Sequence, residues 1–225
     1  MAAVLSYAGR VVDPRAQPVP IRIGGFGGVP GLANYLRENA VTHLVDATHP
    51  FAAQISLHAV QAATETGTPL LAFVRPEWRA EPKDRWLEVP DIAAAAQALA
   101  GPPQRVFLAI GRLHLADFAS QPQHHYLVRL VDPPEAPLPL PQTTLIVARG
   151  PFDVAADRTL LRIHEIETII AKNAGGSGAE AKILAARALG LQVILIARPW
   201  IPPRVMAGCV AEVLEWLDHP ELRGV

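Results

Sequence analysis

The feature that most constrains this chain is a regular alternation of short β-branched runs with longer Ala- and Leu-rich runs. Two of the short runs, residues 70–74 and 193–196, are apolar at every position. Such runs suit strands whose two faces are both buried, as in a parallel sheet covered by helices on each side. The alternation therefore predicts βαβ units and an α/β fold.

The same pattern places the individual elements. The expected strands cover residues 4–7, 21–23, 43–45, 70–74, 106–110, 126–130, 145–147, 168–171 and 192–196. The expected helices cover residues 30–39, 50–66, 91–100, 113–120, 153–164, 179–189 and 209–219. Pro102 and Pro103 stand between a helix and a strand, and proline is disfavoured inside either. We therefore expect two domains, residues 1–101 and 102–225, each of ordinary domain size.

Composition narrows the class of protein. The 225 residues are 50% hydrophobic and carry a formal net charge of −1. A dedicated nucleic-acid binder would show a basic excess, so we expect no nucleic-acid partner. No apolar run approaches the roughly 20 residues of a membrane helix, so we expect no membrane partner. Cys209 is the only cysteine, which excludes an intrachain disulfide and favours a cytoplasmic location.

A glycine-rich run, Gly-Gly-Phe-Gly-Gly at residues 24–28, lies between a predicted strand and a predicted helix. Glycine lets the backbone approach a ligand closely, and a helix N-terminus offers N–H groups and a positive dipole end to an anion. Gly25, Gly27 and Gly28 are therefore candidate ligand-binding residues. The alternative is a flexible turn.

The run Asp-Ala-Thr-His-Pro-Phe at residues 46–51 follows the next predicted strand. Asp46 would stand at the carboxyl end of that strand, where open parallel sheets bind ligands. The structural alternative is a capped helix, with Thr48 as the cap, Pro50 in the first turn and His49 without a role. A Ser-His-Asp triad through Ser56 and a metal site on histidines are both weak readings of this spacing.

A second glycine-rich turn, Lys-Asn-Ala-Gly-Gly-Ser-Gly at residues 172–178, opens a long predicted helix. Ser177 and Glu180 have the spacing of a capping box, but Lys172 and the paired glycines exceed what a cap needs. The Gly-Lys-Ser/Thr ending of a phosphate-binding P-loop is absent. Arg75 and Arg198 end two other strands and could pair with carboxylates of a substrate.

The start of the chain carries Ser6 near the end of the first predicted strand and Arg10 shortly after it. In a dinucleotide-binding fold, an acidic residue at such a strand end selects NAD, and an arginine suits the 2′-phosphate of NADP. Ser6 and Arg10 with no nearby acid before Asp13 therefore suggest NADP, and an exposed arginine without function is the alternative.

Taken together, these runs resemble the precorrin-6A reductases of cobalamin biosynthesis, including the cobalt-precorrin-6A reductases. The Gly-Gly-Phe-Gly-Gly, Asp-Ala-Thr-His-Pro-Phe and Lys-Asn-x-Gly-Gly runs carry the resemblance in this order, and it extends over nearly the whole chain. It implies two Rossmann-like lobes with parallel sheets and an active site in the cleft between them. It also implies an oxidoreductase that uses NADPH, and no metal or flavin, to reduce one double bond of the precorrin-6A macrocycle, giving precorrin-6B.

The resemblance also implies roles for residues. Ser6 and Arg10 would bind the NADPH 2′-phosphate, with Gly25, Gly27 and Gly28 also on the cofactor side. Asp46, Thr48 and His49 would line the junction of nicotinamide and substrate, with His49 as the proton donor. The carboxylates of a small-molecule tetrapyrrole would meet a third set, namely Arg75, Lys172, Asn173, Gly175, Gly176 and Arg198. The residues themselves leave open which glycine loop holds cofactor and which holds substrate, and whether other enzymes of the cobalamin pathway are partners.

The chain departs from the family pattern in one place. Members usually begin with a further strand, a glycine-rich turn and a helix, whereas this sequence starts at what resembles their second strand. We therefore expect the first βα unit, and with it the turn for the cofactor pyrophosphate, to be missing. This departure keeps two alternatives open: a non-catalytic tetrapyrrole-binding protein, and a reductase of another carboxylated substrate.

Overall fold

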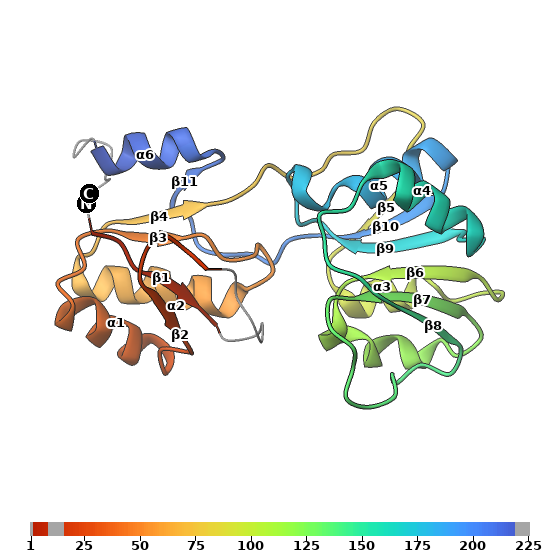
Figure 1. The fold of residues 1–225 in the computed structure, drawn as a ribbon, viewed down its shortest axis with the longest axis horizontal. Coiled ribbons are helices and arrows are strands. Elements are labelled where there is room, and N and C mark those ends of the chain that lie inside the picture. The colour runs from red at the N-terminus through yellow and green to blue at the C-terminus, as the bar shows by residue number, and fades with distance from the viewer. Residues whose placement is uncertain (1, 9–15, 219–225) are drawn as a thin grey trace. The chain divides into compact units, whose positions relative to one another are not determined.

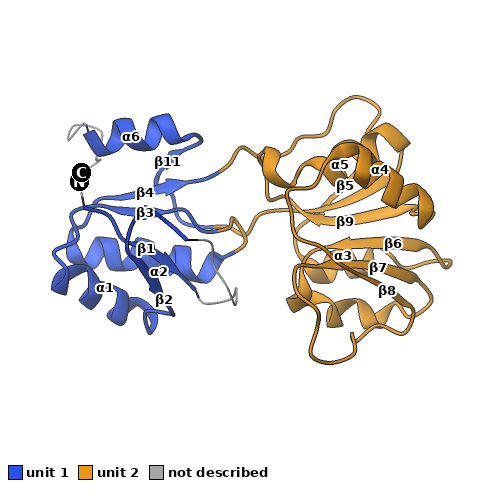
Figure 2. Ribbon diagram, in the orientation of Figure 1, with its two compact units in different colours: residues 1–48, 52–74, 201–225 blue, residues 49–51, 75–200 orange. Residues whose placement is uncertain are grey.

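The computed structural model describes residues 2–8 and 16–218 and divides them into two compact units (Figure 2). Unit 1 comprises residues 1–48, 52–74 and 201–225, and unit 2 comprises residues 49–51 and 75–200. Every strand pairing among these described residues is parallel, as the α/β prediction requires. Among the described residues, no helix has the length and apolar character needed to cross a bilayer.

The described residues of unit 1 form two small sheets and three helices (Figure 1). One sheet pairs β1 (Leu5–Tyr7) with β2 (Ile21–Ile23), and the other has the order β11-β4-β3, with bounds Val205–Ala207, Leu70–Phe73 and Leu44–Asp46. The helices are α1 (Gly28–Glu38), α2 (Ala53–Thr66) and α6 (Val210–Asp218). Leu32 and Leu36 of α1 and Ala62 of α2 belong to one buried core. Trp216 of α6 and Leu71 of β4 belong to a second buried cluster.

Unit 2 is built on one six-stranded sheet in the order β5-β10-β9-β6-β7-β8 (Figure 1). The strands are β5 (Arg85–Val89), β6 (Arg105–Ala109), β7 (His125–Leu130), β8 (Thr143–Val147), β9 (Thr168–Lys172) and β10 (Gln192–Ile196). The helices are α3 (Ile92–Gln97), α4 (Val154–Ile163) and α5 (Ala181–Leu189), with short 3₁₀ turns at Arg112–His114, Ala116–Ser120 and Ser177–Ala179.

The unit 2 sheet is buried on both faces. Val193 and Leu195 of β10 belong to one apolar core, and Ile194 and Ile196 belong to another. Successive side chains of a strand point to opposite faces, so the two cores lie on either side of the sheet. Residues 193–196 are apolar at every position because both faces of β10 are buried.

Two strands that the sequence pattern did not indicate connect the units. β5 follows β4 of unit 1 along the chain but pairs with β10 in unit 2, and β11 follows β10 but pairs with β4 in unit 1. The chain therefore passes between units near Val74 and Trp200. The expected boundary at residues 101 and 102 lies inside unit 2, because β5 and α3, which precede it, belong to the large sheet and its core.

Candidate functional site

The second glycine-rich turn lies at the carboxyl end of β9 and is fastened to the segment that follows β4. Gly176 N–H donates to the carbonyl of Pro76 at 3.0 Å, and the Trp78 indole N–H donates to the carbonyl of Gly176 at 2.9 Å. A Cβ at Gly175 would lie 2.1 Å from that Pro76 oxygen, and φ is +67°. The paired glycines therefore permit a close contact between two loops that no other residue type would allow.

Asn173 completes this contact. Its side-chain oxygen accepts from Trp78 N–H at 2.9 Å and its amide donates to the Trp78 carbonyl at 3.1 Å, and the residue is 4% exposed. The amide thus substitutes for a strand neighbour and satisfies two backbone groups of a segment that lies far away in sequence. Asn173 was expected to bind substrate, and the structure uses its amide inside the protein.

Arg198, like Asn173, holds loop backbone groups through its side chain. Its Nε donates to the carbonyl of Asn173 at 2.9 Å, and Nη2 donates to the carbonyl of Arg75 at 2.8 Å. The carboxylate of Glu77 lies 3.5 Å from Nε. The expected substrate ligand Arg198 is therefore occupied by loop carbonyls, which it draws together.

Arg75 is different. Its side chain packs over Gly176, where a Cβ would lie 2.8 Å from Arg75 Cδ. The described part of the chain offers its guanidinium no hydrogen-bond or ion-pair partner. A half-buried cation of this kind can take a carboxylate from a ligand.

His49 lies in the segment 49–51, which belongs to unit 2, and its Nδ1 accepts from Phe51 N–H at 3.2 Å. The proton of the neutral ring is therefore assigned to Nε2. Desolvation, followed by the charges of Arg75, Lys172, Arg198 and Lys182, lowers the pKa of His49 to about 4. His49 is an exposed residue, and at neutral pH its ring is an uncharged hydrogen-bond donor in the positive field of these four cations.

Lys172 and Lys182 supply further positive charge in unit 2. Lys172 Nζ lies 5.4 Å from the centre of the Phe51 ring. Phe51 belongs to the same segment, residues 49–51, as His49. Lys182, in the first turn of α5, is 8% exposed, donates from Nζ to the Ala179 carbonyl at 2.5 Å and lies 5.0 Å from the Trp78 ring. Burial lowers the pKa of Lys182 to about 8. The sequence pattern predicts no site role for Lys182, because nothing local indicates that this lysine is buried.

Asp46 and Thr48 come together in unit 1, at the carboxyl end of β3. Asp46 is 6% exposed, and its Oδ1 accepts from Thr48 N–H at 3.1 Å and from Thr48 Oγ1 at 2.7 Å. Thr48 Oγ1 lies 3.2 Å from Ser56 Oγ, and Arg204 Nη2 lies 3.8 Å from Asp46 Oδ2. The buried carboxylate thus fixes the turn between β3 and α2.

The expected helix starts near these runs are corrected by the structure. α2 begins at Ala53 with Ala52 as N-cap, so Thr48 is not a cap and Pro50 is not in the first turn. α5 begins at Ala181 after a 3₁₀ turn, and the side chain of Glu180 makes no cap bond. In both places the helix begins later than the local pattern favours and has no side-chain cap.

The first glycine-rich run lies in unit 1 between β2 and α1. Gly27 is the N-cap of α1 with φ +80°, no side chain caps the helix, and a Cβ at Gly24, Gly25 or Gly27 would meet nothing within 4 Å. This helix start is therefore open to an anion. Ser6 Oγ lies 3.4 Å from Arg22 Nη1, next to this run. Arg10, the other expected 2′-phosphate ligand, lies outside the described residues.

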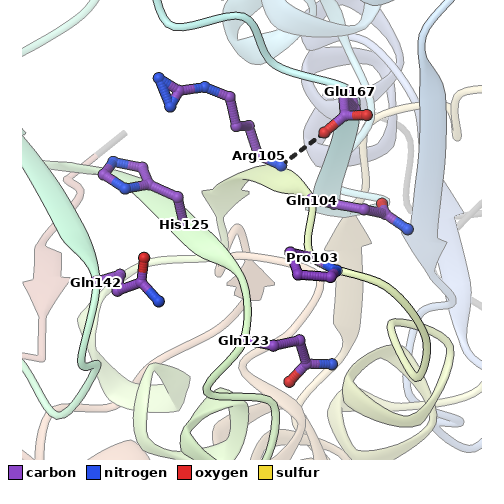
Figure 3. A pocket seen from close by; sticks show the side chains of 7 residues that line it. All are labelled: Pro103, Gln104, Arg105, Gln123, His125, Gln142 and Glu167. Carbon is purple, nitrogen blue, oxygen red and sulfur yellow. Dashed lines mark hydrogen bonds between the residues drawn. The ribbon is translucent and has the colours of Figure 1, made fainter.

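A separate pocket of about 170 Å³ lies at the amino ends of the unit 2 strands (Figure 3). Its lining is Pro103, Gln104, Arg105, Gln123, His125, Gln142 and Glu167. The Arg105 backbone N–H donates to Glu167 Oε2 at 2.9 Å, and the ring of His125 lies 2.8 Å from Thr144 Oγ1. Open parallel sheets bind ligands at the carboxyl ends of their strands, so we place the candidate site there and not at this pocket. Within residues 2–8 and 16–218, no three metal-ligating side chains gather to hold an ion.

Known proteins are similar to this chain in sequence and in fold. The sequence profile of a family described as precorrin-6x reductase CbiJ/CobK matches residues 1–218. A precorrin-6A reductase of Rhodobacter capsulatus is 59% identical over 218 residues, which are 96% of this chain and 87% of that protein. A cobalt-precorrin-6A reductase of Priestia megaterium is 31% identical over 198 residues, 84% of this chain and 76% of that protein.

The solved structure of a CobK precorrin-6A reductase matches with a TM-score of 0.92 at 59% identity, covering 96% of this chain and 86% of that one. The profile match, the identities and the shared fold agree with the ordered motifs. The chain belongs to the precorrin-6x reductase CbiJ/CobK family.

Proposed function

We propose that this oxidoreductase uses NADPH to reduce one double bond of the precorrin-6A macrocycle, which yields precorrin-6B. The observation that carries the proposal is the 59% identity to a precorrin-6A reductase over 96% of the chain. Relatives at 51% and 46% identity bear the same name, whereas those named for cobalt-precorrin-6A are 31% and 30% identical. This gradient favours the metal-free macrocycle as the substrate.

The substrate is a polyanion, because its macrocycle carries many carboxylates. Arg75 and Lys172 bind these carboxylates, since both are cationic and lie near His49 at the carboxyl ends of the unit 2 strands. Asn173, Gly175, Gly176 and Arg198 hold the loops that present them. Recognition of the substrate thus depends on two cations, and the loops that carry them are held in place by hydrogen bonds within the protein.

The unit 1 residues fit a nicotinamide dinucleotide. An uncapped helix start at Gly28 and open space beside Gly24, Gly25 and Gly27 leave room for an anionic ligand. Ser6 and Arg10 serve the 2′-phosphate. When bound, NADPH supplies a hydride to the macrocycle. Asp46 and Thr48, joined by two hydrogen bonds at the carboxyl end of β3, serve the nicotinamide.

Reduction of a double bond also requires a proton at the second carbon. His49 holds a proton on Nε2 while its ring is neutral. Substrate carboxylates that approach Arg75 and Lys172 offset the positive field around His49, so the ring gains a second proton more readily. We therefore assign His49 as the proton donor, activated by the charge of its own substrate.

The test is consumption of NADPH by the purified chain with authentic precorrin-6A, and with its cobalt-loaded counterpart in parallel. We expect turnover with precorrin-6A and slower turnover with the cobalt form. Binding of the macrocycle without consumption of NADPH would support the non-catalytic alternative. Oxidation of NADPH with another carboxylated substrate only would overturn the assignment of precorrin-6A.

A further inference from the structure

Arg22 lies in the middle of β2, and its register partner on β1 is Ser6. Its Nη1 donates to the Gly24 carbonyl at 2.6 Å, and its Nη2 donates to the Gly25 carbonyl at 2.7 Å. The guanidinium also lies 3.9 Å from the centre of the Phe26 ring. Two hydrogen bonds and a cation–π contact therefore fix the plane of this guanidinium before any ligand arrives.

The charge of Arg22 is not balanced inside the protein. Residues 2–8 and 16–218 place no carboxylate within 4 Å of its guanidinium. A guanidinium has five N–H groups, and the bonds within these ranges start from Nη1 and Nη2 and leave Nε unpaired. A half-buried cation with unused donors is suited to an anionic ligand.

Ser6 indicates which anion this is. Its hydroxyl lies 3.4 Å from Arg22 Nη1, a distance longer than that of a good hydrogen bond. A phosphate oxygen placed beside both groups could accept from the hydroxyl and the guanidinium together. Ser6 and Arg22 are register partners in the middle of the β1–β2 pair, one residue before the carboxyl ends of these strands. In a dinucleotide-binding fold, such a strand end is where the adenosine ribose is read.

We propose that Arg22 is a further ligand of the NADPH 2′-phosphate, beside the Ser6 and Arg10 assigned above, and that its charge contributes to the preference for NADPH over NADH. Because the ligand is the cofactor assigned above, this inference rests on the proposed function. The same side chain holds the carbonyls of Gly24 and Gly25, so it also couples the phosphate to the glycine-rich run at the start of α1.

The test is a fluorescence titration of the full chain with NADPH and with NADH. We expect Arg22→Gln to raise the Kd for NADPH by about 10- to 100-fold, because charge-assisted hydrogen bonds are lost, and to change the Kd for NADH by less than about threefold. Arg22→Lys keeps the charge but loses the planar fork, so we expect a smaller loss. Arg37→Gln is the matched control, since Arg37 lies exposed on α1 with its Nη1 3.4 Å from Asn34, and we expect no change.

The outcomes separate the two claims. A wild-type chain that prefers NADPH, with an Arg22→Gln variant that keeps the preference, would overturn the role of Arg22 alone. Equal losses for NADPH and NADH would also overturn it, because Arg22 would then only hold the glycine-rich run. A wild-type chain that binds neither dinucleotide would overturn the proposed cofactor and this inference together. Circular dichroism of each variant checks folding, and Arg22→Lys carries the test if Arg22→Gln does not fold.

Discussion

The side-chain amide of Asn173 forms hydrogen bonds with both the N–H and the carbonyl of Trp78, at 2.9 and 3.1 Å, inside unit 2. One buried residue thus joins the turn after β9 to the segment that enters unit 2 from β4. The position of Arg75 and of the paired glycines depends on this junction. Its geometry predicts a structural role that can be separated from ligand binding.

Asn173→Ala should destabilise the protein. It leaves the N–H and carbonyl of Trp78 without partners in a buried place, and the expected loss is about 2–4 kcal/mol in the free energy of unfolding. Urea unfolding measures this loss. A variant of unchanged stability that binds the macrocycle more weakly would contradict the structural role and favour direct contact of Asn173 with substrate.

Gly175→Ala should be more damaging than a glycine-to-alanine change elsewhere in the same turn. A Cβ at Gly175 would meet the Pro76 oxygen at 2.1 Å with φ +67°, so we expect a loss of at least about 2 kcal/mol. Gly178→Ala is the matched control, because a Cβ there meets nothing within 4 Å, and we expect a change within about 0.5 kcal/mol. Thermal unfolding of both variants decides the matter, and equal melting temperatures would contradict the proposed clash.

The sequence indicates these loops but not how they interlock. Glycine-rich turns after apolar strands are local signals, so residues 24–28 and 172–178 stand out in the sequence, and each lies where a helix or 3₁₀ turn begins. The hydrogen-bond partners of Asn173 and Arg198 include backbone carbonyls that the fold brings near. No local sequence pattern predicts these contacts. Their side chains therefore read as ligand-binding residues in the sequence.

Some strands are evident from the sequence and others are not. The apolar runs of β4 and β10 are evident because both faces are buried. β5 is an edge strand of unit 2 with exposed Arg85 and Glu88, and β11 has three residues, so neither gives a strong period. The exchange of these strands between units is a property of chain topology, which no local pattern reveals. Pro102 and Pro103, which suggest a boundary in the sequence, mark only the connection between α3 and β6.

His49 should titrate far below an ordinary histidine. Desolvation and the neighbouring cations hold its pKa at about 4, so its NMR titration should have a midpoint near that value. The unfolded chain takes up this proton near pH 6.5 and the folded chain does not, so His49 lowers stability as pH falls from about 6.5 to about 4. Arg75→Gln should move the midpoint upward, and a midpoint near 6.5 in the wild-type chain would contradict the positive field.

Lys182→Met should raise stability at pH 7. Burial lowers the pKa of Lys182 from 10.5 to about 8, so at pH 7 the folded chain carries a buried charge that water would solvate better. We expect a gain of about 1–3 kcal/mol at pH 7, which shrinks as pH rises above about 8 and the folded lysine loses its proton. Urea unfolding at pH 7 and pH 10 measures it. Lower stability of the variant at pH 7 would show that the Ala179 and Trp78 contacts outweigh the cost of burial.

Arg75→Gln should weaken substrate binding more than it slows the chemical step. A lost charge-assisted contact with a carboxylate should raise KM for precorrin-6A by about 10-fold or more and leave kcat within about threefold. Arg79→Gln is the control, because Arg79 is an exposed arginine of the same loop. Steady-state kinetics with both variants test this. An unchanged KM in Arg75→Gln would remove Arg75 from the substrate site.

The most direct measurement is the mass of the product formed from precorrin-6A with NADPH that carries deuterium at both reactive positions of its nicotinamide ring. Direct hydride transfer predicts a product heavier than the unlabelled one by a single deuterium. It also predicts that deuterium from heavy water enters at the protonated carbon when unlabelled NADPH is used. A product without deuterium from labelled NADPH, or no product at all, would contradict an NADPH-dependent reduction of the macrocycle by this chain.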